Sequence, residues 1–407
     1  MNSGLDSATS GALVRDYLLL GLRFDRVEEG YVDSFTGDPA LRRAVDNEPP
    51  PEPADLVGQA ERLLAALPGA DGLDPARADF IGAHLRALAC AGRKFAGRDV
   101  GFVDEVEAYF DVQIAKGEPE RYRQAHVKLD EALGGSGPLA GRMLTYRAGE
   151  EVPPERLEDC IHAFSSALRD RVRADYPLPD AETITYEVVT DKPWSGFNYY
   201  LGNYASTVAV NADLKQQMSS LPRLVAHESY PGHHTEHCRK EAGLVEGKGH
   251  AEQTLFLVNT PQCLMAEGLA DLALYAAIGP SWGGWAGEIY ADLGLAFDGD
   301  RAQAVSEASA ALADVRQDAA LMLHDEHRDV DEVVEFLKRW LLVNDERARQ
   351  MLRFLSSPLW RAYTSTYVEG YRLLRTWLEA RPEGVGLTER FGRLLDEPLI
   401  PSSLRAG

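Results

Sequence analysis

The chain has 407 residues, of which 45% are hydrophobic and 26% are charged, as in a globular protein with a sizeable core. Its net charge of -22 argues against nucleic acid as a partner, because a phosphate backbone requires a basic surface. The first residues show no basic region followed by an apolar run, and the apolar segment 17–22 is far shorter than the ~20 residues of a membrane span. We therefore expect a cytoplasmic protein that does not interact with membranes.

The first 150 residues are predicted to form a series of amphipathic helices. Apolar residues recur at helical spacing in 10–25, and Gly, Pro or Asp residues bound most of the segments that follow. We expect these further helices at 56–67, 74–91, 104–116, 118–133 and 138–146. Residues 1–150 are assigned as a helical region that supports a metal-binding region at 151–407, with the two forming one compact unit.

A change of pattern after a helix at 153–175 predicts a small sheet. The segments 183–190 and 206–211 are rich in β-branched residues, which favours strands. They flank a turn at 193–196 and a cluster of aromatic residues. The strand 206–211 is expected to align an extended substrate along the sheet edge, and a purely structural hairpin is the alternative.

The segment 221–241 holds four of the ten histidines and carries the main functional signal. His227 is followed directly by Glu228, an arrangement with which zinc hydrolases place a general base beside the metal. Pro231 stands four residues after His227, where proline would clash with the carbonyl of His227, so the helix must open or kink there. We predict that His233 then takes the place of the second ligand, and we keep His234 as the alternative.

A third ligand is predicted on the helix that begins at Thr260-Pro261. Glu267 is the only acidic residue between Glu252 and Asp271, and a carboxylate among apolar residues is costly unless it is paired or bound to a metal. Two histidines and one carboxylate form a common catalytic zinc site. The alternative is that Glu267 lies on the solvent-exposed face of its helix.

Three later side chains are secondary candidates. Arg316 and His324 lie eight residues apart in a predicted helix, and Tyr367 belongs to a tyrosine stripe in the helical segment 360–378. Without further context the pattern favours a solvated helix face for the first two, and a tyrosine stripe at this spacing usually lines a core or a groove. A tyrosine hydroxyl that faces a metal would be able to donate to an oxyanion.

These motifs together resemble a known family. The run HESYPGHH at 227–234 resembles the H-E-x-x-P-G-H-H signature of a widespread bacterial family labelled as a domain of unknown function. That family is similar to the mostly helical metallopeptidases of the thimet oligopeptidase and carboxypeptidase Taq groups. The run EGLA at 267–270 matches its E-G-W-A with leucine for tryptophan, and YVEG at 367–370 matches a terminal Y-x-x-G whose preceding Pro-Gly-Gln is missing. Arg316 and His324 match an R-x7-H element in which Ala320 replaces the usual aspartate.

The resemblance implies a mainly α, gluzincin-like fold with a small sheet beside the metal helix, and a zinc-dependent hydrolase. The resulting hypothesis is one Zn²⁺ per chain held by His227, His233 and Glu267, with Glu228 as the general base in cleavage of a peptide or another small amide. His324 or Tyr367 would stabilise the oxyanion, and Arg316 would bind a substrate carboxylate.

Two alternatives remain from the sequence. One is a non-catalytic metal-binding or scaffold protein on a peptidase-like fold, which the missing motif elements favour. The other is a metal-free polar core, although so dense a cluster of histidines is hard to satisfy without an ion.

Overall fold

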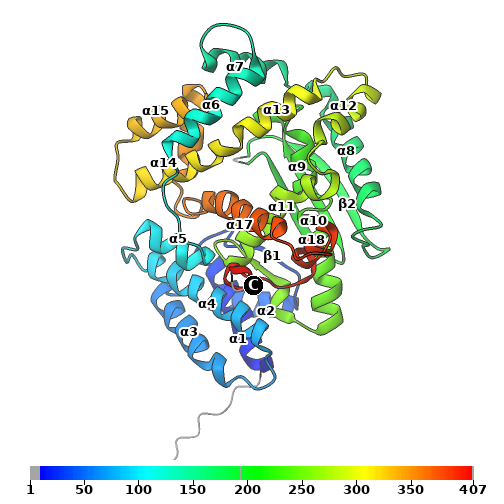
Figure 1. Ribbon diagram of the computed structural model, residues 1–407. Helices are drawn as coiled ribbons and strands as arrows, with labels where there is room; N and C mark the ends of the chain where they lie inside the picture. Colours follow the sequence, from blue (N-terminus) through cyan, green and yellow to red (C-terminus); the bar gives the residue numbers. More distant parts are fainter. Residues whose placement is uncertain (1–9, 193, 406–407) are drawn as a thin grey trace, which may run out of the picture. The chain divides into compact units, whose positions relative to one another are not determined.

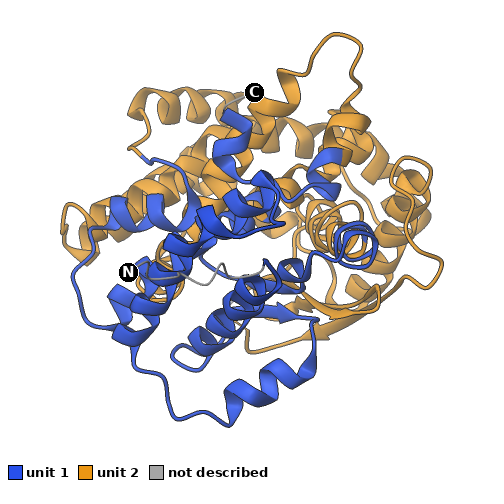
Figure 2. Cartoon of the chain, turned by 90° about the horizontal axis from the view of Figure 1, so that it is seen from below, with its two compact units in different colours: residues 1–114, 239–266, 393–407 blue, residues 115–238, 267–392 orange. Residues whose placement is uncertain are grey.

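The computed structural model describes residues 10–192 and 194–405, and Figure 1 labels its elements. The chain divides into two compact units, shown in separate colours in Figure 2. Unit 1 comprises residues 1–114, 239–266 and 393–407, and unit 2 comprises residues 115–238 and 267–392. The division therefore does not follow the predicted boundary at residue 150. Two later segments return to unit 1, and such long-range packing leaves no mark in local sequence patterns.

Unit 1 is mainly helical, and its helix starts follow local capping chemistry. Asp38 and Asp74 each precede a proline, and their carboxylates accept hydrogen bonds from the backbone N–H groups of Ala40 and Arg77. A two-stranded antiparallel pair joins β1 to β5. The helices and strands of this unit are α1 (Ser10–Asp25), β1 (Val32–Phe35), α2 (Pro39–Asp46), α3 (Pro53–Ala66), α4 (Pro75–Phe95), α5 (Phe102–Phe110), β5 (Leu255–Leu257) and α19 (Pro401–Arg405).

The expected helices of this region are confirmed, but two predicted ends are wrong. Helix α4 continues through Gly92, where the side chains of Val57 and Phe24 leave no room for a Cβ atom. That glycine therefore permits close helix packing and does not terminate the helix. Helix α5 ends at Phe110, well before residue 116, because Asp111 adopts a left-handed conformation with φ of 55°.

Unit 2 contains most of the remaining helices. The expected helices at 118–133, 138–146 and 153–175 are confirmed, and so is the helix start at Thr260-Pro261. The elements are α6 (Pro119–Leu133), α7 (Leu139–Gly149), α8 (Leu157–Val172), α9 (Leu221–Glu228), α10 (His233–Lys240), α11 (Pro261–Ile278), α12 (Trp282–Asp292), α13 (Gly299–Ser309), α14 (Asp314–His324), α15 (Val330–Leu341), α16 (Asp345–Leu355), a π-helix (Thr366–Gly370), α17 (Tyr371–Glu379) and α18 (Leu387–Asp396). Helices α10, α11 and α18 contain residues of both units.

A three-stranded sheet in unit 2 packs beside α9. Its order is β2 (Thr183–Val189), β4 (Ala205–Asn211) and β3 (Gly196–Gly202), with β2 parallel and β3 antiparallel to β4. The prediction of a mainly helical fold with a small sheet beside the metal helix is confirmed, but β3 was missed. Its inward-facing positions are Asn198, Tyr200 and Gly202, so the strand lacks the apolar alternation that marks a half-buried strand.

The sheet order overturns one expected role. Strand β4 is hydrogen-bonded on both sides, so the segment 206–211 has no free edge that could align a substrate. The two strands with a free edge are β2 and β3. Of these, β3 packs against α9, which carries His227 and Glu228.

The predicted interruption after His227 is confirmed. Helix α9 ends at Glu228 and α10 begins at His233, with a turn at 229–232 between them. Within this turn the N–H of Gly232 donates to the carbonyl of Ala226 at 3.0 Å. A Cβ atom on Gly232 would lie 2.0 Å from the carbonyl oxygen of His227, so only glycine fits there.

A second pair of glycines brings two motif segments together. A Cβ atom on Gly268 would lie 2.5 Å from the backbone carbon of Gly370, so α11 and the π-helix meet backbone to backbone. This contact explains why glycine follows Glu267 and why glycine ends the Y-x-x-G run. π-Helical turns are often found at functional sites.

No single helix among the described residues is both long and apolar enough to cross a membrane. Helices α11 and α12 meet the length and composition criteria only when taken together, and they are bent by 77° at their junction.

Candidate metal centre

Two imidazoles and one carboxylate converge in unit 2. His227 comes from the last turn of α9, His233 from the first residue of α10, and Glu267 from the second turn of α11. Their candidate ligand atoms all lie within 4.8 Å of one another, and these three residues form the only such group among the described histidines, cysteines and acidic residues. The structure thus brings together the three side chains predicted as ligands.

The spacing of the ligand atoms fits a tetrahedral cation. The Nε2 atoms of His227 and His233 are 3.1 Å apart, and Glu267 Oε2 lies 3.3 Å from Nε2 of His227. Glu267 Oε1 lies 3.7 Å from Nε2 of His233. With bonds of ~2.0 Å, two ligand atoms of a tetrahedral zinc site are separated by about 3.3 Å.

The two carboxylate oxygens of Glu267 provide a second indication that this group could hold a cation. Its Oε1 accepts a hydrogen bond from the hydroxyl of Tyr363 at 2.6 Å. Its Oε2 is buried and accepts no hydrogen bond, and it lies 3.3 Å from Nε2 of His227. A buried carboxylate oxygen without a hydrogen bond is costly, and a cation at this point would satisfy it.

A carboxylate behind His227 sets the orientation of its ring. His227 Nδ1 donates to Asp271 Oδ1 at 3.2 Å. Nε2 is therefore the ring nitrogen that faces the site and can offer a lone pair to a metal. Histidine ligands of metals commonly donate their other N–H to a carboxylate in this way. Asp271 lies four residues after Glu267 on the same helix face, so this spacing was a signal that the sequence interpretation missed.

Burial and neighbouring charges shift the pKa values of the three candidate ligands. Burial opposes the charged form of His227, but Asp271, Glu267 and Glu228 outweigh it and raise the pKa of His227 well above 6.5. A metal that binds Nε2 must therefore displace a proton from it. Burial lowers the pKa of His233, although Glu267 opposes this effect. For Glu267, burial favours the neutral acid, but His227, His233 and Tyr363 together lower its pKa. The carboxylate is thus held ionised and ready for a cation.

The predicted base, Glu228, is buried at the end of α9 and is 5% exposed. Asn198 on β3 donates its side-chain N–H to the backbone carbonyl of Glu228 at 2.6 Å. Gly196, at the start of β3, is so close that a Cβ atom there would lie 3.0 Å from Glu228 Oε1. The unpredicted strand β3 therefore holds the backbone of Glu228 and lies close to its carboxylate.

The other predicted site residues lie in different surroundings. His324 Nε2 is 2.7 Å from the carbonyl oxygen of Leu355, and His324 is not part of the three-residue group. Tyr367 stacks edge-on against Tyr363 with ring centres 5.6 Å apart, so it is one ring removed from Glu267. Tyr363, which was treated only as part of a stripe, is the tyrosine that contacts the carboxylate.

Arg316 is exposed and makes no hydrogen bond or ion pair with any described residue. Tyr367 and Asp271 lie near its guanidinium group. Two further arginines, Arg147 and Arg347, lie near it. Burial lowers the pKa of Arg147 to about 10, and the positive charges of Arg347 and Arg316 contribute. This concentration of positive charge favours an anion.

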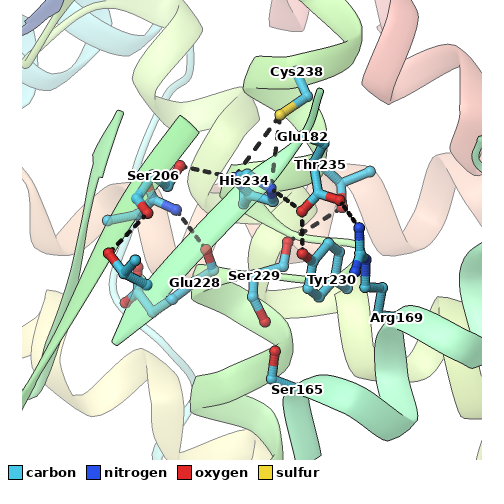
Figure 3. A network of polar contacts seen from close by, with 12 residues as sticks. Ser165, Arg169, Glu182, Ser206, Glu228, Ser229, Tyr230, His234, Thr235 and Cys238 are labelled. Carbon is cyan, nitrogen blue, oxygen red and sulfur yellow. Dashed lines mark hydrogen bonds and ion pairs between the residues drawn. The ribbon is translucent and has the colours of Figure 1, made fainter. Parts of the chain in front are cut away.

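His234, the alternative ligand, is not part of the three-residue group and belongs to the polar network drawn in Figure 3. It is fully buried, and its two ring nitrogens lie 2.9 Å from Glu182 Oε1 and 2.8 Å from Ser206 Oγ. Tyr230 and Arg169 also bind Glu182. Burial opposes ionisation of Glu182, but the hydrogen bonds from His234 and Tyr230 and the charge of Arg169 lower its pKa to about 2.

This depressed pKa predicts an acid-dependent loss of stability. The folded-state pKa of Glu182 lies below the unfolded value of 4.5, so its ionised form stabilises the fold above pH 4.5 and this contribution is lost as the pH falls towards 2. The full contribution is about 3 kcal/mol. We expect urea unfolding to show a stability gap between wild type and Glu182→Gln that shrinks by about 2 kcal/mol from pH 6 to pH 3. Exposed Glu187→Gln on β2 is the control, and an unchanged gap for Glu182→Gln would contradict the assignment.

Comparison with known proteins finds similar folds but does not show the function. No protein-family model and no curated protein matches the sequence. A "putative lipoprotein" from Colwellia psychrerythraea is similar in structure, with a TM-score of 0.52 and 13% identity over 86% of this chain and 65% of that one. A second "putative lipoprotein of unknown function", from Shewanella oneidensis, has a TM-score of 0.50 and 13% identity over 90% and 75% of the two chains.

An M32 carboxypeptidase from Deinococcus radiodurans R1 covers 96% of this chain and 93% of its own length, at 12% identity and a TM-score of 0.42. That similarity is too low to support an argument about function. The present chain spans less than two thirds of the Colwellia protein. The first two similarities concern the fold alone.

Proposed function

We propose that this protein is a metal-dependent hydrolase, and specifically a zinc peptidase. The observation that carries the proposal is the convergence of His227, His233 and Glu267, whose candidate ligand atoms lie within 4.8 Å of one another. The buried Oε2 of Glu267 accepts no hydrogen bond and lies 3.3 Å from Nε2 of His227. Asp271 supports the proposal because it fixes the tautomer of His227 in which Nε2 is free to bind a metal. The set of His227, His233 and Glu267 has the composition of a catalytic zinc site with an open position.

When bound, zinc would act as a Lewis acid that makes a water molecule acidic near neutral pH. In this chain Glu228 is placed to take the proton of the attacking water and to deliver it to the leaving amine. Its fixed position, between Gly196 and the hydrogen bond from Asn198, limits the freedom of the carboxylate. Such preorganisation is what an efficient general base requires.

The substrate is proposed to be a peptide or another small amide. The free edge of β3 is available to pair with an extended backbone, and β3 is the strand that packs against α9. Arg316, supported by the charges of Arg147 and Arg347, would bind a substrate carboxylate. Tyr367 or His324 would stabilise the oxyanion, and Tyr367 is favoured because its neighbour Tyr363 touches Glu267.

A combined metal and activity assay tests this proposal. Purified protein should contain about one zinc ion per chain and should cleave members of a peptide library, with chelator abolishing cleavage and added zinc restoring it. A protein without bound metal that also fails to bind added zinc would refute the proposal. Stoichiometric zinc without cleavage of any peptide would favour the metal-binding scaffold.

Replacement of Gly196 tests the placement of Glu228. In Gly196→Ala the new methyl group would lie 3.0 Å from Glu228 Oε1 and 2.8 Å from Leu224 Cδ1, so the carboxylate must shift. We expect kcat to fall by ~10-fold with zinc content unchanged, because even a 1 Å misplacement can cost about 10²-fold. Gly141→Ala is the control, since Gly141 lies in α7 with nothing within 4 Å of a Cβ atom. Equal kcat for both variants would contradict the assignment.

A further inference from the structure

A buried polar network lies behind the turn that separates the two candidate histidine ligands (Figure 3). Glu182 is its centre, and the side chain is only 2% exposed. One oxygen, Oε1, accepts hydrogen bonds from both the hydroxyl of Tyr230 and Nε2 of His234. The other oxygen, Oε2, pairs with Arg169 of α8. Every oxygen of this buried carboxylate is thus satisfied, as its burial requires.

Of the two groups that share Oε1, Tyr230 lies within the turn 229–232 and His234 lies in α10 directly after it. Tyr230 precedes Pro231 and Gly232, and His234 follows His233 directly. Both are buried, with relative exposures of 1% and 0%. A single carboxylate oxygen therefore ties together the two ends of the segment that presents His233.

His234 serves as an anchor in this arrangement. Adjacent residues of a helix point about 100° apart, so His233 and His234 cannot face the same ion. The second nitrogen of His234 is held at 2.8 Å by Ser206 Oγ on β4. Both ring nitrogens are thus engaged, and the ring joins α10 to the sheet and to Glu182.

We propose that Glu182 is a positioning residue of the metal centre, which fixes the imidazole of His233 by holding Tyr230 and His234. This inference rests on the proposed function, since it assumes that His227, His233 and Glu267 bind a metal. Glu182 makes its hydrogen bonds and ion pair with Tyr230, His234 and Arg169 and not with any of these three side chains, so it acts through the backbone of the turn. A ligand must be held within about 0.5 Å of its productive position, so a loosened turn weakens the site.

Removal of the carboxylate charge should weaken metal binding without removing a ligand. In Glu182→Gln the neutral amide cannot replace the charged acceptor shared by Tyr230 and His234. We expect the zinc dissociation constant, measured by competition with a chelator, to rise 10- to 100-fold, as for other residues that support metal ligands. We also expect the visible spectrum of the Co²⁺-substituted protein to change, which a distant loss of stability would not cause.

Two further variants keep the test decisive. Tyr230→Phe removes one of the two donors while retaining the ring, and it should raise the zinc dissociation constant by a smaller factor. If Glu182→Gln does not fold, the zinc affinity of Tyr230→Phe tests the proposal by itself. Tyr122→Phe is the matched control, because it deletes a buried hydroxyl of unit 2 that donates to Asp318 at 2.8 Å. It should lower stability and leave zinc affinity unchanged.

The proposal is overturned if Glu182→Gln and Tyr230→Phe bind zinc as tightly as wild type and give the same cobalt spectrum. It is also overturned if Tyr122→Phe weakens zinc binding to the same extent, since the effect would then follow stability alone. Failure of the wild-type protein to bind zinc is a separate result, which would refute the proposed function and this inference with it.

Discussion

Glu228→Gln is expected to lower kcat by 10²- to 10⁴-fold while the protein keeps its zinc. Glutamine has the shape of glutamate but cannot accept the proton of the attacking water. Glu228 is not one of the three side chains whose ligand atoms converge, so the metal should stay bound. Zinc content by elemental analysis and kcat on a cleaved library peptide are the two measurements.

Exposed Glu187→Gln on β2 is the matched control, and it should leave both measurements unchanged. Loss of zinc together with activity in Glu228→Gln would show that Glu228 is a ligand or supports one, and the assignment as base would be wrong. Full activity in Glu228→Gln would exclude it as the base.

The residues of the convergent group were accessible from the sequence because each carries a local signal. His227 and His233 flank a proline that cannot continue a helix, and this alone predicts that the turn must open. Glu267 is an isolated acid in an apolar helix, which is unfavourable without a compensating partner. These signals depend on neighbouring residues in the sequence and can be recognised without knowledge of the tertiary packing.

The supporting residues were missed for a different physical reason. Tyr363 reaches Glu267 across 96 residues of sequence, and Glu182 reaches His234 across 52. Neither contact produces a periodic pattern or a motif near either residue. The close backbone approach of Gly268 and Gly370 is another long-range contact that the sequence does not reveal. A glycine is required at position 268 because the backbone of Gly370 packs against it.

The role given to strand β4 was wrong because pairing partners cannot be read from a strand's own composition. The segment 206–211 is rich in β-branched residues, but this composition does not distinguish a central strand from an edge strand, and the segment lies in the middle of the sheet. The edge strand β3 carries Asn198 at an inward position, and this polar residue serves Glu228. The polar contact made by Asn198 thus interrupts the apolar alternation that would mark β3 as a strand.

Gly232→Ala is expected to abolish zinc binding and to destabilise the fold. The added Cβ atom would lie 2.0 Å from the carbonyl oxygen of His227 and 2.4 Å from that of Ala226, and neither backbone group can move without displacing His227. The hydrogen bond from Gly232 N–H to Ala226 would be lost as well. Overpacking of this kind costs about 1–3 kcal/mol, and a steric conflict with backbone belongs at the upper end. Urea unfolding and zinc competition measure the two effects.

Gly141→Ala again separates these effects from a general response to alanine. Its Cβ atom meets nothing within 4 Å in α7, so the substitution should be neutral or stabilising by up to ~1 kcal/mol, with zinc affinity unchanged. If Gly232→Ala folds as stably as wild type and binds zinc with equal affinity, the turn does not set the distance between the two imidazoles. The close pairing of His227 and His233 would then have to be set by the packing of α9 and α10 and by Glu267, which lies near both imidazoles.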